Sequence, residues 1–136
     1  MIVLDEQLIG YDFPSIIGRW YPGAVVNIIQ LRPRTLIPDE DIPTLLRSIR
    51  QPTFVTINVA DFWRRMAPDR HFCIVCFSLL DRELEAMPLL LRRLFKIEPF
   101  RSRRSRLGKI ARISQQQAQY YTADSWAVQT LRWSMR

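Results

Sequence analysis

The chain begins with an apolar run, Met1 to Leu4, that is followed directly by two carboxylates, Asp5 and Glu6. An apolar run with β-branched Ile2 and Val3 is typical of a strand buried on both faces of a parallel sheet. In open α/β sheets, ligands bind just beyond the carboxyl ends of the strands. Asp5 therefore stands where a catalytic or metal-binding acid is expected, with capping of the next helix as the alternative role.

Further apolar segments alternate with helical patterns along the rest of the chain. Strands are expected at 1–6, 24–31, 53–57, 72–80, 109–114 and 118–122. Helices are expected at 6–21, 39–51, 84–97 and 125–136, with a loop at 32–38. This β-α-β-α-β order predicts one α/β domain over 1–136, with a central mostly parallel sheet, helices on both faces and a C-terminal β-hairpin.

Charge is distributed unevenly between the two halves of the chain. Residues 1–63 hold 5 Lys or Arg against 7 Asp or Glu, whereas residues 64–136 hold 15 against 6. Almost all of these cations are arginines, which favour bidentate contacts with phosphate. This distribution indicates that the basic half binds a polyanionic partner and presents it to the carboxylates of the acidic half. The alternative is that the basic residues form only a solvated surface.

Hydropathy, the cysteines and the few glycines argue against several classes of protein and site. No apolar run approaches the roughly 20 residues of a membrane span, and no secretory leader pattern is visible, so a cytoplasmic location without membrane association is expected. The two cysteines, Cys73 and Cys76, lie in an expected strand and should point to opposite faces, which excludes a shared metal or a redox pair. A phosphatase-like enzyme is disfavoured because the chain has only 4 glycines and no phosphate-cradling loop.

Oxygen-bearing side chains recur at three expected strand ends or helix starts. They are Asp5, then Asp39 with Glu40 and Asp41, then Asn58 with Asp61. With short right-handed crossovers these positions meet at one edge of the sheet. Clustered carboxylates raise one another's pKa unless a cation lies between them, and oxygen ligands without His or Cys favour Mg²⁺ or Mn²⁺. Taken singly, the same residues read as helix caps and acidic helix starts.

The order of these motifs resembles a known family. Segments 2–8 (IVLDEQL), 39–42 (DEDI) and 55–62 (VTINVADF) resemble the short standalone PIN-like domains, which are relatives of the toxin ribonucleases of bacterial toxin–antitoxin pairs. Segment 106–114 (RLGKIARIS) is similar to a strand near the C-terminus of these proteins. The resemblance implies a three-layer PIN-like fold, Mg²⁺- or Mn²⁺-dependent ribonuclease activity, a homodimer and a small helix-turn-helix antitoxin as partner.

The resemblance also implies roles for individual residues. Asp5 and Asp39 match metal-binding acids, whereas Asn58 stands where an aspartate is expected and one extra residue separates it from Asp61. An amide oxygen ligates Mg²⁺ without bringing charge, so a catalytically weak or inactive module that binds RNA or a protein is the alternative. Glu6, Glu40 and Asp41 are candidates for positions near the metal or for the general base.

Six cations are the candidates for holding the RNA backbone, because phosphate contacts supply most nonspecific affinity. They are Arg101, Arg103, Arg104, Arg106, Lys109 and Arg112. Trp63 and the Tyr120–Tyr121 pair are candidates for base stacking, with core or dimer packing as the favoured alternative. His71, the only histidine, has no second histidine nearby and is not expected to ligate a metal.

Overall fold

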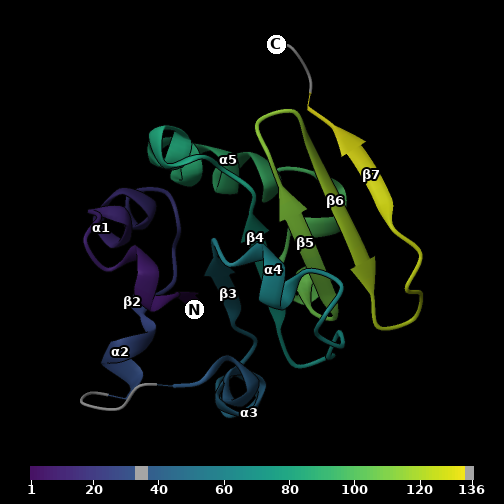
Figure 1. The fold of residues 1–136 in the computed structure, drawn as a ribbon, viewed down its shortest axis with the longest axis horizontal. Coiled ribbons are helices and arrows are strands. Elements are labelled where there is room, and N and C mark those ends of the chain that lie inside the picture. Colours follow the sequence, from purple (N-terminus) through teal and green to yellow (C-terminus); the bar gives the residue numbers. More distant parts are fainter. Residues whose placement is uncertain (33–36, 134–136) are drawn as a thin grey trace.

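The protein is described by a computed structural model that covers residues 1–32 and 37–133. In this part of the chain, seven strands form one mixed sheet in the order β2-β1-β3-β4-β5-β6-β7 (Figure 1). The strands are β1 (Ile2–Leu4), β2 (Val25–Asn27), β3 (Thr53–Thr56), β4 (Cys73–Phe77), β5 (Lys109–Ile113), β6 (Gln117–Thr122) and β7 (Gln129–Arg132). The α/β class expected from the sequence is therefore confirmed.

The five strands from β2 to β5 across the sheet are parallel, and only β6 and β7 run antiparallel to their neighbours. In Figure 1 the arrows of β3, β4 and β5 point the same way, and that of β6 points the opposite way. Leu4 at the end of β1 pairs with Val55 near the end of β3. The segments that follow these two strands consequently emerge at the same edge of the sheet.

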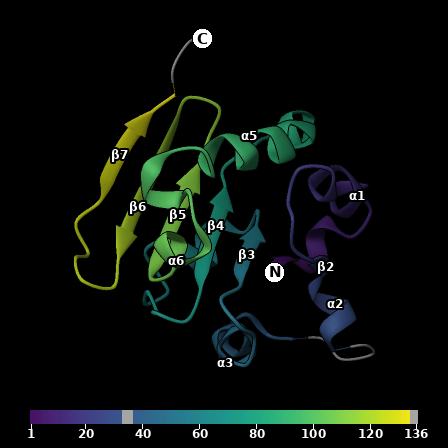
Figure 2. The same cartoon turned by 180° about the vertical axis from the view of Figure 1, so that it is seen from behind.

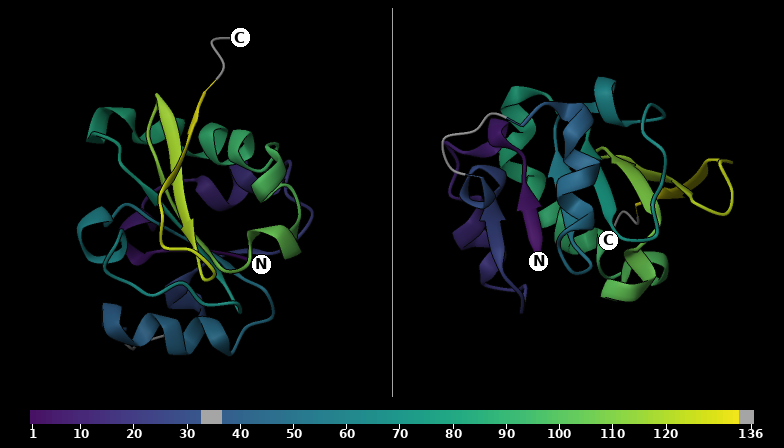
Figure 3. Two further views of the ribbon diagram at one scale, coloured as in Figure 1. Left: turned by 90° about the vertical axis from the view of Figure 1, so that its right-hand side faces the viewer. Right: turned by 90° about the horizontal axis from the view of Figure 1, so that it is seen from below.

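Alternation along the strands buries both faces of the sheet. Leu4 packs into one hydrophobic cluster with residues of α1 and α5, whereas the adjacent Val3 packs into a second cluster with residues of α3 and α4. The helices are α1 (Phe13–Gly18), α2 (Ile28–Leu31), α3 (Ile42–Arg47), α4 (Val59–Phe62), α5 (Met87–Leu94) and α6 (Arg103–Arg106). Figure 3 (left) shows α4, in teal, and α6, in green, on opposite sides of the sheet.

Two of the expected elements are wrong. The strand expected at 24–31 ends at Asn27, because the Asn27 side chain accepts a hydrogen bond from the backbone N–H of Ile29 and Gln30 accepts one from that of Asn27, which starts α2. The helix expected at 125–136 is absent from its described part, where 129–132 form β7 and pair with β6, and residues 134–136 lie outside the described residues. The Trp133 indole donates to the Ser114 carbonyl oxygen at 2.7 Å and holds the end of this strand.

Other expected elements are present but shorter or divided. The segment 6–21 forms a 3₁₀ turn, η1 (Glu6–Leu8), and then α1, which has a proline in its first turn. The segments 39–51 and 84–97 likewise begin as the 3₁₀ turns η2 (Asp39–Asp41) and η3 (Asp81–Ala86). Residues 33–36 of the loop expected at 32–38 lie outside the described residues.

The cysteines behave as the strand spacing predicts. Cys73 and Cys76 are free and buried, and they belong to the two different hydrophobic clusters on opposite faces of the sheet. Burial raises the pKa of Cys73 to about 12 and also raises that of Cys76. Both thiols are therefore packing groups. None of the helices within 1–32 and 37–133 combines the length and apolar character needed to cross a bilayer.

Candidate functional site

Asp5 follows β1 directly and its side chain is buried, with 5% of its surface exposed. Its Oδ2 accepts a hydrogen bond from Thr56 Oγ1 at 2.6 Å, and its Oδ1 accepts one from the Glu6 backbone N–H at 2.8 Å. Burial raises the pKa of Asp5, although both hydrogen bonds act in the opposite direction. Asp5 thus caps the η1 turn and also presents a desolvated carboxylate at the carboxyl end of the strand.

The backbone around Asp5 is fixed from both neighbouring strands. Its N–H donates to the Val55 carbonyl oxygen at 2.9 Å, which continues the pairing of β1 with β3. Its carbonyl oxygen accepts a hydrogen bond from the Asn27 side-chain amide at 3.1 Å, from the end of β2. Asn27 was not singled out from the sequence, because it is one polar residue inside an apolar run. It orients the backbone of the acid and does not touch the carboxylate.

Asn58 bridges two further carboxylates. Its side-chain amide nitrogen donates to Asp39 Oδ2 at 3.1 Å and to Asp61 Oδ2 at 2.8 Å. Its amide oxygen accepts a hydrogen bond from the Asp61 backbone N–H at 3.2 Å and caps α4. The Asn58 amide N–H groups therefore donate to two carboxylates of like charge. The amide oxygen is already occupied by the hydrogen bond that caps α4.

Thr56 connects the two halves of this arrangement, and sequence analysis missed it. While its hydroxyl donates to Asp5, the same oxygen accepts a hydrogen bond from the Asn58 backbone N–H at 3.0 Å. Thr56 is fully buried at the end of β3, two residues before Asn58. The signal that could have found it is a threonine at the end of a buried strand, immediately ahead of the polar positions.

Electrostatics shows that these acids lie close enough to act on one another. The pKa of Asp39 is raised to about 6, first by burial, then by a hydrogen bond with Asp61 and by the charges of Asp5, Asp61 and Glu6. We call Asp5, Glu6, Asp39, Asn58 and Asp61 the acidic edge. The chain thus brings together side chains from three separate segments, as the topology requires.

Glu40 and Asp41 lie on the η2 turn beside Asp39, and both side chains are exposed. Neither carboxylate makes a hydrogen bond to another described residue. Their position in the turn before α3 places negative charge at the start of that helix, which is favourable. Their assignment as general-base candidates stays a prediction.

The acidic edge offers the kind of donor that hard divalent cations take, namely carboxylate oxygens. However, within the described residues no group of three or more His, Cys, Asp or Glu side chains is arranged closely enough to hold a metal ion. The Asn58 amide nitrogen lies between two of the carboxylates instead. Carboxylate oxygens suit Mg²⁺ or Mn²⁺ chemically, but the described side chains do not gather three of them around one point, so the assignment of Asp5, Asp39, Asp61 and Asn58 as metal ligands stays a prediction.

The six cations expected to hold RNA are not gathered beside these acids. α6, which carries Arg103, Arg104 and Arg106, precedes β5 and lies at the end of the sheet where the parallel strands begin (Figure 2). Arg101, Arg103 and Arg104 are exposed, whereas Arg106 is buried with 5% of its surface exposed. The Lys109 ammonium donates to the Ser105 carbonyl oxygen.

Arg112, the last of the six, lies on β5 opposite Cys76 of β4 and is half-buried. The six residues are therefore spread over exposed, half-buried and buried positions.

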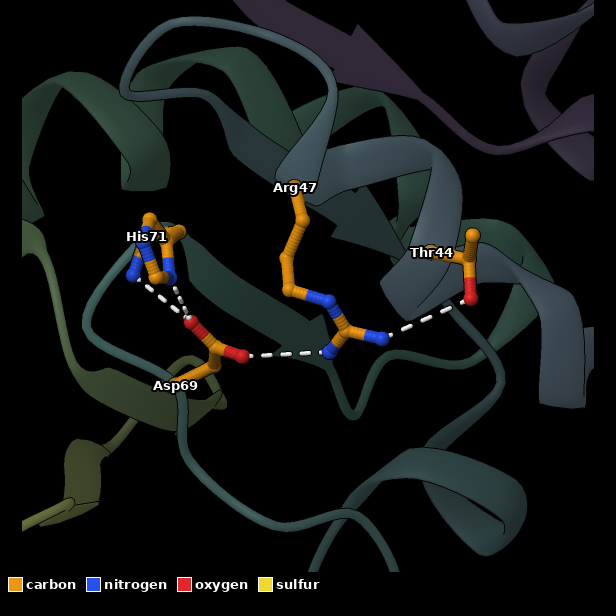
Figure 4. Close-up of polar contacts among 4 residues, drawn as sticks. All are labelled: Thr44, Arg47, Asp69 and His71. Atoms are coloured by element: carbon orange, nitrogen blue, oxygen red, sulfur yellow. Dashed lines mark hydrogen bonds and ion pairs between the residues drawn. The ribbon is translucent and has the colours of Figure 1, made fainter.

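His71 has a partner that accounts for it without a metal. Its Nδ1 lies 2.7 Å from Asp69 Oδ1, and its backbone N–H donates to the same oxygen at 2.8 Å (Figure 4). Arg47 Nη1 donates to the other oxygen of Asp69 at 3.1 Å, so one carboxylate joins α3 to the loop before β4. Burial works to raise the pKa of Asp69, but these hydrogen bonds outweigh it and hold the pKa below its ordinary value.

The aromatic candidates for base stacking pack against other rings. Tyr121 is fully buried, lies 5.1 Å from Trp63 between ring centroids, and donates its hydroxyl to the Met66 carbonyl oxygen at 3.0 Å. Trp126 stacks on Tyr121 at 5.6 Å, and Tyr120 packs edge-on against Phe100 at 5.2 Å. In this structure these rings pack in the core or against the rings of β6.

Comparison of the chain with models of known protein families, with curated proteins and with solved structures gave no match. What can be said of function therefore depends on the acidic edge and on the chemistry of its residues.

Proposed function

We propose that the protein is a metal-dependent ribonuclease that hydrolyses RNA phosphodiester bonds at the acidic edge, with Mg²⁺ or Mn²⁺ as its cofactor. The observation that carries the proposal is that Asp5, Asp39 and Asp61 come together from three segments. They lie so close that burial and the neighbouring charges raise the pKa of Asp39 to about 6. Without a counter-charge such a cluster is costly, and a divalent cation is the usual remedy.

The residues of the chain have distinct roles in this proposal. Asp5, Asp39 and Asp61 would hold the cation, which supplies charge stabilisation and an activated water when bound. Thr56 positions the Asp5 carboxylate through its 2.6 Å hydrogen bond, and Asn27 fixes the backbone that carries it. Asn58 holds Asp39 and Asp61 together before the cation arrives.

Cleavage of a labelled single-stranded RNA, with and without Mg²⁺ or Mn²⁺, tests this proposal. We expect metal-dependent cleavage that falls by at least about 100-fold in Asp5→Asn and in Asp39→Asn, because each variant loses one charged ligand. A matched control is Asp124→Asn, which removes an equally charged but exposed aspartate in the loop between β6 and β7. Cleavage that survives in Asp5→Asn, or that needs no metal, would contradict the proposal.

A second candidate function is supported by Asn58. Its amide nitrogen, rather than a third ligand oxygen, faces Asp39 and Asp61, which favours a PIN-like module that binds RNA or a protein without cutting. The Asn58→Asp variant separates the two candidates. Three neighbouring carboxylates repel one another, so metal should bind this variant more tightly and restore its stability. Cleavage gained only in this variant would favour the non-catalytic function for the natural chain.

The remaining expectations from the family resemblance are also proposals. We infer a PIN-like fold from the acid positions together with the mostly parallel sheet, and we propose a homodimer that is inhibited by a small helix-turn-helix antitoxin. Sedimentation of the purified chain tests the dimer. Growth arrest on expression, relieved by co-expression of a small helix-turn-helix protein encoded beside this chain, is the outcome expected of a toxin–antitoxin pair.

A further inference from the structure

A second concentration of charge lies at the opposite end of the sheet. A pocket of about 340 Å³ opens between α5, α6 and the segment that joins α1 to β2. Five cationic side chains contribute to its wall, namely Arg92, Lys96, Arg101, Arg103 and Arg106. We call this the basic pocket. Its volume is in the range of small-molecule binding sites.

The cations of the basic pocket have no carboxylate partners in the part of the chain that the structure describes. Within residues 1–32 and 37–133, the ion pairs are those of Asp69 with Arg47 and His71 and of Asp124 with Arg70, and none involves the pocket. Arg101 donates its guanidinium hydrogens to the Lys96 carbonyl oxygen at 3.2 Å, a neutral acceptor. Five positive charges thus converge on one cavity with no negative side chain in its wall.

Arg106 is the member whose position most requires an explanation. It is buried, its Nη1 donates to the Phe100 carbonyl oxygen at 2.9 Å, and its guanidinium lies 3.9 Å from the centroid of the Phe95 ring. Its Nε has no hydrogen-bond partner among the described residues. A buried cation without a counter-charge is unfavourable, and an anion bound in the pocket would compensate it.

Aromatic surface lies beside these charges. Trp20 lines the basic pocket and is half-buried, and its ring meets Phe95 edge-on at 5.9 Å. Trp20 and Arg92 also line an adjoining hollow of about 400 Å³ between α1 and α5. An indole next to several guanidinium groups offers a flat apolar contact and phosphate contacts within one site, which together suit a nucleobase and its phosphate.

We propose that the basic pocket binds a nucleoside phosphate, with the phosphate held by Lys96, Arg101, Arg103 and Arg106 and the base against Trp20. The same chemistry is presented by a free mononucleotide and by the phosphorylated terminal nucleotide of an oligonucleotide. The proposal requires neither a metal ion nor the acidic edge, because the pocket lies at the other end of the strands.

Isothermal titration calorimetry of the full chain in EDTA tests this proposal with five probes. They are adenosine 5′-monophosphate, adenosine, inorganic phosphate, and a short oligoadenylate with and without a 5′-phosphate. We expect the monophosphate to bind at least about tenfold more tightly than either adenosine or phosphate, since it makes both kinds of contact. A 5′-phosphorylated oligonucleotide that binds more tightly than the monophosphate identifies the RNA terminus as the source, and the reverse order identifies the free nucleotide.

Two variants at exposed positions, Lys96 and Arg103, leave the fold undisturbed, and a third at the half-buried Trp20 tests the aromatic contact. Arg103→Gln and Lys96→Gln should each weaken monophosphate binding about tenfold, because each removes one charge-assisted contact. Trp20→Leu should weaken monophosphate binding and leave phosphate binding unchanged. Arg65→Gln, which removes an exposed arginine outside the pocket, is the matched control for net charge.

Three results would overturn the proposal. The first is no saturable heat with the monophosphate at millimolar concentration. The second is an equal loss of affinity in Arg65→Gln and Arg103→Gln, which would mean only nonspecific attraction to a basic protein. The third is a monophosphate affinity that Trp20→Leu does not change. RNA cleavage plays no part in these measurements, so failure of the ribonuclease proposal would leave them interpretable.

Discussion

The two ends of the parallel sheet carry opposite charge, and they hold it in different ways. At the acidic edge, Asp39 and Asp61 share the N–H groups of one neutral amide, that of Asn58, so the carboxylates are hydrogen-bonded but not neutralised. At the basic pocket, Arg106 stacks on an aromatic ring and donates to a carbonyl oxygen, so the cation is likewise contacted but not paired. Each end therefore holds charge that no described side chain of opposite charge compensates, which is what the two ligand proposals share.

One short sheet is enough to keep two such regions apart. The parallel strands β1, β3 and β4 are three to five residues long, so roughly 10–17 Å separates their two ends. This exceeds the screening length of about 8 Å at physiological ionic strength, so exposed charges at the two ends interact weakly. The core between them is what both regions share, and variants can be chosen that disturb one end only.

The largest effect is expected from removing the aromatic anchor of the acidic edge. Phe62 is fully buried, follows Asp61 in α4, and packs on Phe54 at 5.5 Å between centroids. Phe62→Ala should lower the free energy of unfolding by about 3–5 kcal/mol, because a large buried ring is lost and a cavity remains. Urea denaturation followed by fluorescence measures this change.

The control for this variant is Leu89→Ala on α5, whose side chain is 68% exposed. Its truncation should change the free energy of unfolding by less than about 0.5 kcal/mol. If the two variants lose similar stability, α4 does not depend on the packing of Phe62, and the acidic edge must be held in another way.

A smaller effect is expected at Thr56, where one hydroxyl serves two partners. Thr56→Val keeps the shape but removes the donor to Asp5 and the acceptor of the Asn58 N–H, both buried or half-buried. The cost should be about 1–3 kcal/mol, and the pKa of Asp5 should rise further because a hydrogen bond that favours its charged form is lost. Chemical denaturation at pH 7 measures the stability.

Thr56→Ser is the matched control, because serine restores the hydroxyl without the methyl group. It should recover most of the stability that Thr56→Val loses. The basic pocket, at the other end of the strands, should be unaffected by either change. Monophosphate binding that falls in Thr56→Val to the same extent as stability would argue that the two ends are coupled.

Much of the fold could be predicted because its signals are local. Apolar runs such as 53–57 and 109–114 mark strands buried between helices, and their order implies parallel pairing. The misassigned segments have competing local signals. Asn27 lies inside an apolar run but starts a helix through a capping box. Residues 129–132 are mostly exposed, so their sequence has no alternating apolar pattern that would predict β7.

The acidic edge could be predicted in part for the same reason. Strand ends that carry Asp5 and Asn58 must meet if the strands are parallel, whatever the side chains do. What the sequence could not show is which atom of Asn58 faces the carboxylates, because that depends on the α4 cap. The basic pocket could not be predicted from the sequence. Its cations come from α5, α6 and the segment between them, and they meet Trp20 of a distant segment only in the folded chain.

The pH dependence of stability should distinguish the two ends further. Because the pKa of Asp39 is raised to about 6, the folded state binds its proton more tightly than the unfolded state does. The stability from this proton is fully present below about pH 4 and is lost as pH rises through about 6. Wild type should therefore lose melting temperature relative to Asp39→Asn between pH 4.5 and 7.5, as thermal denaturation can measure. Parallel curves for the two proteins would contradict this.

The smallest effect is expected at Asp69, whose pKa is shifted in the opposite direction from that of Asp39. Its stabilisation is present above the ordinary aspartate pKa of about 3.9 and is lost as pH falls through the lower folded value. Arg47→Gln removes a partly exposed partner 3.1 Å away, so it should cost at most about 1 kcal/mol at pH 7, and the cost should shrink as acidification protonates Asp69. Arg50→Gln, an exposed neighbour, controls for net charge. An Arg47→Gln cost that grows on acidification would reverse the assigned sign, because only a charged Asp69 benefits from Arg47.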